Sequence, residues 1–153
     1  MALVEVPPRA AAAVQLRHRR DLDEVDLRRE LVALSEEGYS QTRIAQWLQI
    51  SQSAVSQLLK TARGGSVARA GFSGASPREL CQRYAAGLLS REQVVDELTR
   101  WEYVPMAQHE AYEDLPVQPE GTIWDVYRAA MDGLIDEGLY GEVAARVAAD
   151  ASA

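Results

Sequence analysis

The sequence predicts an all-α protein built from two helical parts that a flexible linker joins. Apolar residues recur at helical spacing over long stretches, for example at Leu27, Leu31 and Leu34. Signals that start helices separate these stretches, such as the run Ser76-Pro77-Arg78-Glu79. Residues 64–77 are rich in Gly and Ser, a composition typical of a linker. With 153 residues, 47% of them hydrophobic, the chain is long enough for one ordinary domain or two small ones.

Residues 1–20 are predicted to form a basic arm in front of the first domain. Pro7 and Pro8 interrupt its start, and residues 9–15 could be helical. The arm ends in a basic cluster of Arg17, His18, Arg19 and Arg20. Such a cluster can contact a phosphate group or a minor groove beside a docked helix. The alternative is a solvated tail.

Residues 21–63 are predicted to form a domain of three short helices. Acidic residues precede the first helix, where negative charge suits the positive end of the helix dipole: Asp21, Asp23, Glu24 and Asp26. Its apolar stripe consists of Val25, Leu27, Leu31, Val32 and Leu34. Gly38 is expected to end this helix as a residue with positive φ.

The second and third helices are expected at Gln41–Leu48 and Gln52–Ala62, with a tight turn between them. Ser40 and Ser51 are suitable N-caps for the two helices. The apolar positions expected to face inward and lock the helices together are Ile44, Ala45, Leu48, Ile50, Val55 and Leu58. Ala45 is expected where the two helices cross, a position at which a larger side chain would push them apart. An ordinary helical hairpin in a core is the alternative interpretation.

This segment, and above all the run Ile50–Leu59 (ISQSAVSQLL), resembles the helix-turn-helix of bacterial transcriptional regulators. It is most similar to the three-helix version shared by phage-type repressors, partition proteins, resolvases and transposases, and the resemblance covers about residues 24–63. The family usually has Gly at the turn position that Gln49 occupies here. Gln can adopt the left-handed conformation at a modest energetic cost.

The resemblance implies a sequence-specific regulator of transcription whose third helix reads a major groove. The exposed side chains suited to base edges are Gln52, Ser53, Ser56 and Gln57. Those expected to contact phosphates are Ser40, Gln41, Arg43, Lys60 and Arg63. Repressors of this size usually bind two half-sites of double-stranded DNA as homodimers.

The charge distribution favours DNA binding by the first part of the chain. The whole chain carries −7, but residues 1–75 carry a net charge of +2 and residues 76–153 carry −9. No acidic residue occurs from Gly38 to Arg78. A duplex repels carboxylates and releases counterions when cations contact its phosphates, so this window suits a DNA-facing surface.

Residues 78–153 are predicted to form an acidic domain of two helical hairpins, at about 77–101 and 123–149. The segments that begin at Gly87 and Gly133 share a pattern in which Gly ends one helix and Ser90 or Asp136 caps the next. Thr122 is expected to cap the helix that follows it. An irregular loop, residues 102–121, lies between the hairpins.

Aromatic residues are concentrated in this acidic domain, and Trp101, Tyr103 and Tyr112 are candidates for a partner-binding surface. Aromatic side chains rimmed by carboxylates suit an interface with a basic protein. The alternatives are that the aromatics fill the core or form a dimer contact. A small DNA-binding head followed by an acidic half resembles the layout of antitoxins, which bind a protein partner and repress their own promoter. An adaptor or assembly factor of a mobile element is a further possibility.

The sequence favours neither catalysis nor a cofactor. A metal site at His109, Glu110, Glu113 and Asp114 would need a second histidine at the metalloprotease spacing, and solvated charge is the preferred interpretation. Cys81 has no partner for an intrachain disulfide, so we expect a reduced, cytoplasmic protein in which Cys81 is a buried small residue. No apolar run is long enough to span a membrane.

Overall fold

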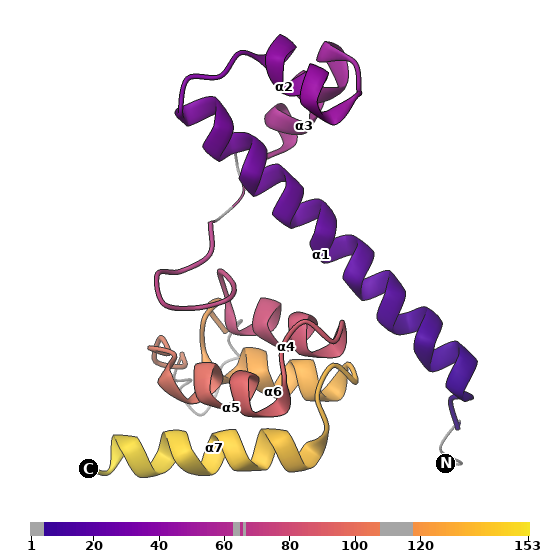
Figure 1. The fold of residues 1–153 in the computed structure, drawn as a ribbon. Coiled ribbons are helices and arrows are strands. Elements are labelled where there is room, and N and C mark those ends of the chain that lie inside the picture. Colours follow the sequence, from indigo (N-terminus) through magenta and orange to yellow (C-terminus); the bar gives the residue numbers. More distant parts are fainter. Residues whose placement is uncertain (1–4, 63–64, 66, 108–117) are drawn as a thin grey trace, which may run out of the picture. The chain divides into compact units, whose positions relative to one another are not determined.

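The computed structural model describes residues 5–62, 65, 67–107 and 118–153, and within them the chain forms seven helices and no strand (Figure 1). This confirms the predicted all-α fold. The helices are α1 (Pro8–Glu36), α2 (Gln41–Leu48), α3 (Gln52–Ala62), α4 (Pro77–Ala85), α5 (Arg91–Arg100), α6 (Ile123–Met131) and α7 (Glu137–Ala151). Two compact units divide the chain: one is Arg20–Val67, and the other joins Met1–Arg19 to Ala68–Ala153.

Helix α1 is longer than the sequence predicts. It runs for 29 residues from Pro8 and includes the basic cluster at Arg17–Arg20. The acidic residues expected at the start of a helix therefore lie inside α1, where Glu24 forms an ion pair with Arg28 at 2.6 Å. Pro8 suits the first helical position, and neither Pro nor Gly follows before Gly38, so nothing interrupts the helix near residue 21. Gly38, with φ of 95°, follows its end as predicted.

Within the unit Arg20–Val67, α2 packs against α3 with the predicted bounds. Ser40 Oγ accepts a hydrogen bond from the Arg43 amide at 3.2 Å, and Ser51 Oγ accepts one from the Ala54 amide at 3.1 Å. Both predicted caps are thus confirmed. The buried core of this unit consists of Leu31, Ile44, Ala45, Val55 and Leu59, with Val32, Leu34 and Leu58 packed against it.

Two of the predicted inward positions are wrong, because Leu48 and Ile50 are exposed. They flank Gln49, which adopts the left-handed conformation with φ of 57° and ψ of 40°. Leu59 is fully buried, whereas Leu58, the predicted position, packs at the edge of the core. Leu59 lies four residues after Val55 and so continues the buried row of α3.

The C-terminal helices form two hairpins, as predicted. Helix α4 packs against α5 and α6, and α7 packs against the same two helices (Figure 1). Positive φ at Gly87 (78°) and Gly133 (80°) ends α4 and α6, and Ser90 and Asp136 cap the helices that follow. The buried core contains Leu80, Cys81, Val94, Val95, Leu98, Trp101, Val126, Ala129, Leu134, Ile135, Leu139 and Val143.

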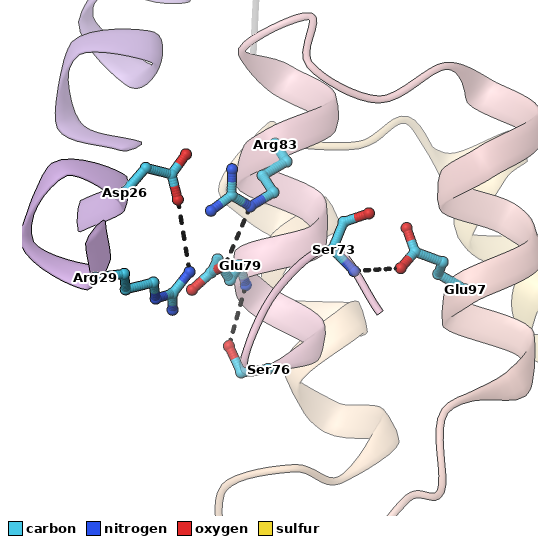
Figure 2. Close-up of polar contacts among 7 residues, drawn as sticks. All are labelled: Asp26, Arg29, Ser73, Ser76, Glu79, Arg83 and Glu97. Atoms are coloured by element: carbon cyan, nitrogen blue, oxygen red, sulfur yellow. Dashed lines mark hydrogen bonds and ion pairs between the residues drawn. The ribbon is translucent and has the colours of Figure 1, made fainter. Parts of the chain in front are cut away.

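The predicted linker contains residues that fold onto this C-terminal unit. The Phe72 ring packs edge-on against Trp101 with centroids 4.7 Å apart. The Ser73 amide donates to Glu97 Oε1 at 2.5 Å, and Ser76 Oγ caps α4 by accepting from the Glu79 amide at 3.1 Å (Figure 2). The described residues from Ala68 onward therefore belong to the C-terminal unit, because an aromatic ring and a buried carboxylate hold them there.

Thr122 occupies the N-cap position of α6 as predicted, but its side chain makes no capping hydrogen bond. The Thr122 side chain is fully buried, and its Oγ1 has no hydrogen-bond partner. Asp125 Oδ2 instead accepts from the Gly121 amide at 2.7 Å. A buried hydroxyl without a partner makes an unfavourable contribution to stability.

Candidate nucleic-acid interface

The predicted reading residues lie on one face of helix α3. Gln52, Ser53 and Gln57 are exposed, and Ser56 is half-buried between them. Val55 is buried on the opposite side of the helix and anchors it to the core. The structure therefore leaves a polar face of α3, which carries no acidic side chain, on the surface of its unit.

The first residues of α2 and α3 are joined by a side-chain hydrogen bond. Gln52 Nε2 donates to Gln41 Oε1 at 2.6 Å. Both side chains are candidates from the sequence, one for a base and one for a phosphate, but their contact depends on the angle between two helices. It fixes the Gln52 amide at the start of α3 and places the N-terminus of α2 beside it.

The predicted phosphate-contacting residues separate into two groups. Ser40, Gln41 and Arg43 belong to the N-terminus of α2, where backbone amides and the helix dipole favour an anion. Lys60 is exposed in the last turn of α3. Arg63 lies outside the described residues.

Charge distinguishes this surface from the rest of the molecule. The sequence contains no carboxylate side chain between Gly38 and Arg78, so none arises from α2, α3 or the turn between them. Three features thus coincide: two helices with a tight turn, a polar face on the second helix, and a positive helix N-terminus beside it.

Comparison with known families bears directly on this arrangement. Residues 23–71 match the family model described as a homeodomain-like domain. This match supports a helix-turn-helix DNA-binding domain in this part of the chain, and the unit Arg20–Val67 is called the homeodomain-like domain below. No curated protein and no solved structure matches the chain.

The homeodomain-like domain carries exposed aromatic side chains that the sequence analysis did not assign to DNA. Tyr39 precedes the cap of α2, and Trp47 lies near the end of that helix. Their ring centroids are 5.2 Å apart in an edge-to-face arrangement. The Arg43 guanidinium carbon lies 5.7 Å from the centroid of the Trp47 ring. The i, i+4 spacing of Arg43 and Trp47 is the sequence signal that could have indicated this contact.

Outside the homeodomain-like domain, the candidate partner-binding aromatics contribute mainly to packing. Trp101 is 7% exposed and belongs to the C-terminal core. The Tyr103 hydroxyl donates to the Leu98 carbonyl at 2.5 Å, and burial raises the pKa of this phenol. Tyr112 lies outside the described residues. The alternative in which aromatics fill the core therefore describes Trp101 and Tyr103 best.

Within the described ranges, no group of three or more His, Cys, Asp or Glu side chains is arranged to hold a metal ion. The candidate set around His109 lies outside these ranges. Cys81 is buried as predicted, and burial raises the pKa of its thiol to about 12, which keeps it protonated at neutral pH. None of the described helices combines the length and hydropathy that a membrane span requires.

Proposed function

We propose that this protein is a sequence-specific regulator of transcription that places α3 in the major groove of its operator. The observation that carries this proposal is the hydrogen bond between Gln41 and Gln52, which orients a glutamine amide at the start of the polar face of α3. Ser53, Ser56 and Gln57 would complete the set of base contacts.

The Gln52 amide retains the groups that an adenine needs. One N–H of its Nε2 is engaged by Gln41, which leaves the second N–H and the Oε1 lone pairs. The remaining N–H suits adenine N7, and Oε1 suits the adenine N6 amino group. Gln41 keeps its own amide N–H groups, which suit a backbone phosphate.

Phosphate contacts would fix the register of the domain on the duplex. Ser40, Gln41 and Arg43 at the start of α2 would hold one phosphate region, and Lys60 with Arg63 would hold another. A single domain of this size contacts few base pairs and binds weakly, so we propose that the regulator acts as a homodimer on two half-sites.

A selection from a pool of random duplexes tests the proposal. The full chain is used to enrich a site, and fluorescence anisotropy compares that site with a scrambled duplex over a salt series. Gln52→Ala should weaken the enriched site by about 1–3 kcal/mol and relax specificity at one base pair. Lys60→Ala should weaken both duplexes alike and lower the salt slope by about one. Gln46→Ala, the same chemical change on the exposed surface of α2, is the matched control.

Different failures have different meanings. Equal losses on both duplexes for Gln52→Ala would contradict the base-reading assignment. Salt-sensitive binding without any enriched site would contradict sequence specificity while leaving DNA binding intact. No binding at low salt would contradict the regulatory function itself.

A second candidate function is that of an antitoxin-type protein whose acidic half binds a basic protein partner. A stripe on α6, formed by Trp124, Tyr127 and Met131, favours it. These residues are exposed at i, i+3 and i+7, and Met131 is 69% exposed. The Trp124 and Tyr127 rings lie 4.8 Å apart. Exposed apolar stripes of this kind mark docking surfaces.

The acidic residues around this stripe favour a basic protein partner. Glu120, Asp125 and Glu137 lie on or next to α6, where Arg128 is the one basic residue of the helix. Titration calorimetry with the basic product of a neighbouring gene would test the candidate. Met131→Glu should abolish binding, whereas Val67→Glu, at an equally exposed apolar position (69%), should not. Equal effects of the two substitutions would contradict a docking role for α6.

A further inference from the structure

Tyr39, which precedes the N-cap of α2, and Arg43 and Trp47 within α2 form an exposed cluster, called here the α2 cluster. Tyr39 is 43% exposed and Trp47 is 52% exposed, although both rings contact each other. Neither ring belongs to the core of its unit. Large aromatic side chains that stay exposed together commonly mark a binding surface.

The α2 cluster begins close to the contact between α2 and α3. Tyr39 immediately precedes the cap residue Ser40, whose Oγ accepts from the Arg43 amide. Gln41, in the same turn, is hydrogen-bonded to the first residue of α3. The cluster therefore begins at the end of α2 that is hydrogen-bonded to the start of α3. A duplex docked on α3 would present its phosphate backbone to this end of α2.

The chemistry of the α2 cluster suits a phosphate. The Arg43 guanidinium, the Tyr39 hydroxyl and the Trp47 indole N–H are all hydrogen-bond donors. The sequence from Gly38 to Arg78 contains no carboxylate side chain, so none lies within the cluster or along α2 and α3. An Arg that stacks on an aromatic face loses less side-chain freedom when it binds, because the ring already restricts its rotamers.

We propose that Tyr39, Arg43 and Trp47 form a clamp for a DNA backbone phosphate, in which Trp47 is the platform that positions Arg43. The inference rests on the proposed function and adds a role for two aromatic residues. The clamp contributes affinity without sequence preference, since a phosphate is the same at every base pair. It extends the contact surface beyond the base pairs that α3 reads.

Anisotropy titrations of the full chain with its enriched site and a scrambled duplex test the clamp. Trp47→Leu should weaken both complexes about three- to tenfold, because it removes the cation–π contact that positions Arg43. Arg43→Ala should weaken both to a similar degree and lower the salt slope by about one. The double variant should bind within about twofold of Arg43→Ala, because residues that act as a unit are not additive.

Two further variants separate a positioning role from a structural one. Trp47→Phe keeps an aromatic face and should recover most of the affinity. Leu48→Ala removes an exposed apolar side chain of the same helix and should bind like the wild type. Circular dichroism should show the same helix content in every variant.

The results that overturn the clamp are distinct from those that overturn the regulatory function. Wild-type affinity in Trp47→Leu, or losses that multiply in the double variant, would refute the clamp alone. Conversion of a dimer to a monomer by Trp47→Leu in sedimentation would reassign the cluster to a second copy of the chain. A wild-type protein that binds neither duplex at low salt would refute both the clamp and the regulatory function.

Discussion

Replacing Gln49 by Gly should stabilise the homeodomain-like domain. Gln49 is the one residue other than Gly with positive φ in the described part of the chain, and its φ of 57° and ψ of 40° lie at the centre of the left-handed region. An L-residue pays about 1–2 kcal/mol for this conformation. Gly avoids that cost but loses about 0.5–1 kcal/mol through the greater freedom of its unfolded chain. The balance is a gain of about 0.5–1 kcal/mol.

The surroundings of Gln49 support this magnitude. Its side chain is exposed, so removal leaves no cavity in the core. The hydrogen bonds that hold the turn use backbone atoms, with the Ile50 amide donating to the Ala45 carbonyl at 3.1 Å. They persist in Gln49→Gly. Gln49→Ala is the matched control, because Ala loses the same side chain but keeps the left-handed strain.

Native-state hydrogen exchange of the Val55 and Leu59 amides measures the effect. Both residues belong to the core of the domain, so the slowest exchange reports its opening free energy rather than that of the C-terminal unit. Gln49→Gly should slow this exchange about two- to fivefold relative to wild type, equivalent to the expected gain. Exchange in Gln49→Gly as fast as in Gln49→Ala would refute the argument from backbone strain.

The remaining predictions concern the C-terminal unit. Thr122→Val removes the unpaired Oγ1 and should stabilise the chain by about 1 kcal/mol in urea unfolding, whereas Thr122→Ser should destabilise it; the opposite order would contradict an unpaired hydroxyl. The Cys81 thiol, with its pKa raised to about 12 by burial, should react with a thiol reagent only on unfolding, and rapid labelling of the native protein at pH 8 would contradict this. The hydrogen bond from Arg91 lowers the pKa of Glu142. The stability that this ion pair contributes is therefore present above the ordinary pKa of a glutamate and is lost as the pH falls through the lowered pKa of Glu142. A carboxyl NMR titration should show the Glu142 pKa moving up in Arg91→Gln, and an unchanged midpoint would exclude Arg91 as the cause.

Local signals explain why parts of the fold could be predicted from the sequence. The bounds of α2 and α3 follow from Ser40 and Ser51, which cap the helices by contacts within three residues. The hairpins of the C-terminal unit likewise follow from Gly and cap residues. Each of these features depends only on neighbouring residues, and the sequence pattern contains all of them.

Contacts between distant residues explain the misses. Trp101 is buried partly because Phe72, which precedes α4, packs against it. Leu48 and Ile50 have the expected apolar character, but the path of the turn leaves them exposed. Helix α1 has a start signal at Pro8, whereas the acidic residues from Asp21 onward indicate a second start that a continuous helix overrides.

The candidate interface likewise contains features that the sequence pattern indicates and contacts that depend on how the helices pack. A pattern of polar residues on α3 is sufficient to propose Gln52, Ser53, Ser56 and Gln57 for bases, and these assignments stay predictions. The bond between Gln41 and Gln52 could not be predicted, because it depends on how two helices cross. The stacking of Arg43 on Trp47 falls between these cases, since its spacing within one helix is visible in the sequence.

The segregation of charge constrains how a regulator of this kind could distinguish its site. Residues 76–153 carry a net charge of −9 and repel any duplex, whatever its sequence. In the proposed complex, that repulsion and the attraction of Arg43 and Lys60 would act on all DNA alike, so neither would change the ratio of specific to random binding. Discrimination would then come from neutral side chains such as Gln52. An affinity that depends strongly on salt, with a specificity ratio that does not, is the behaviour that this division of labour requires.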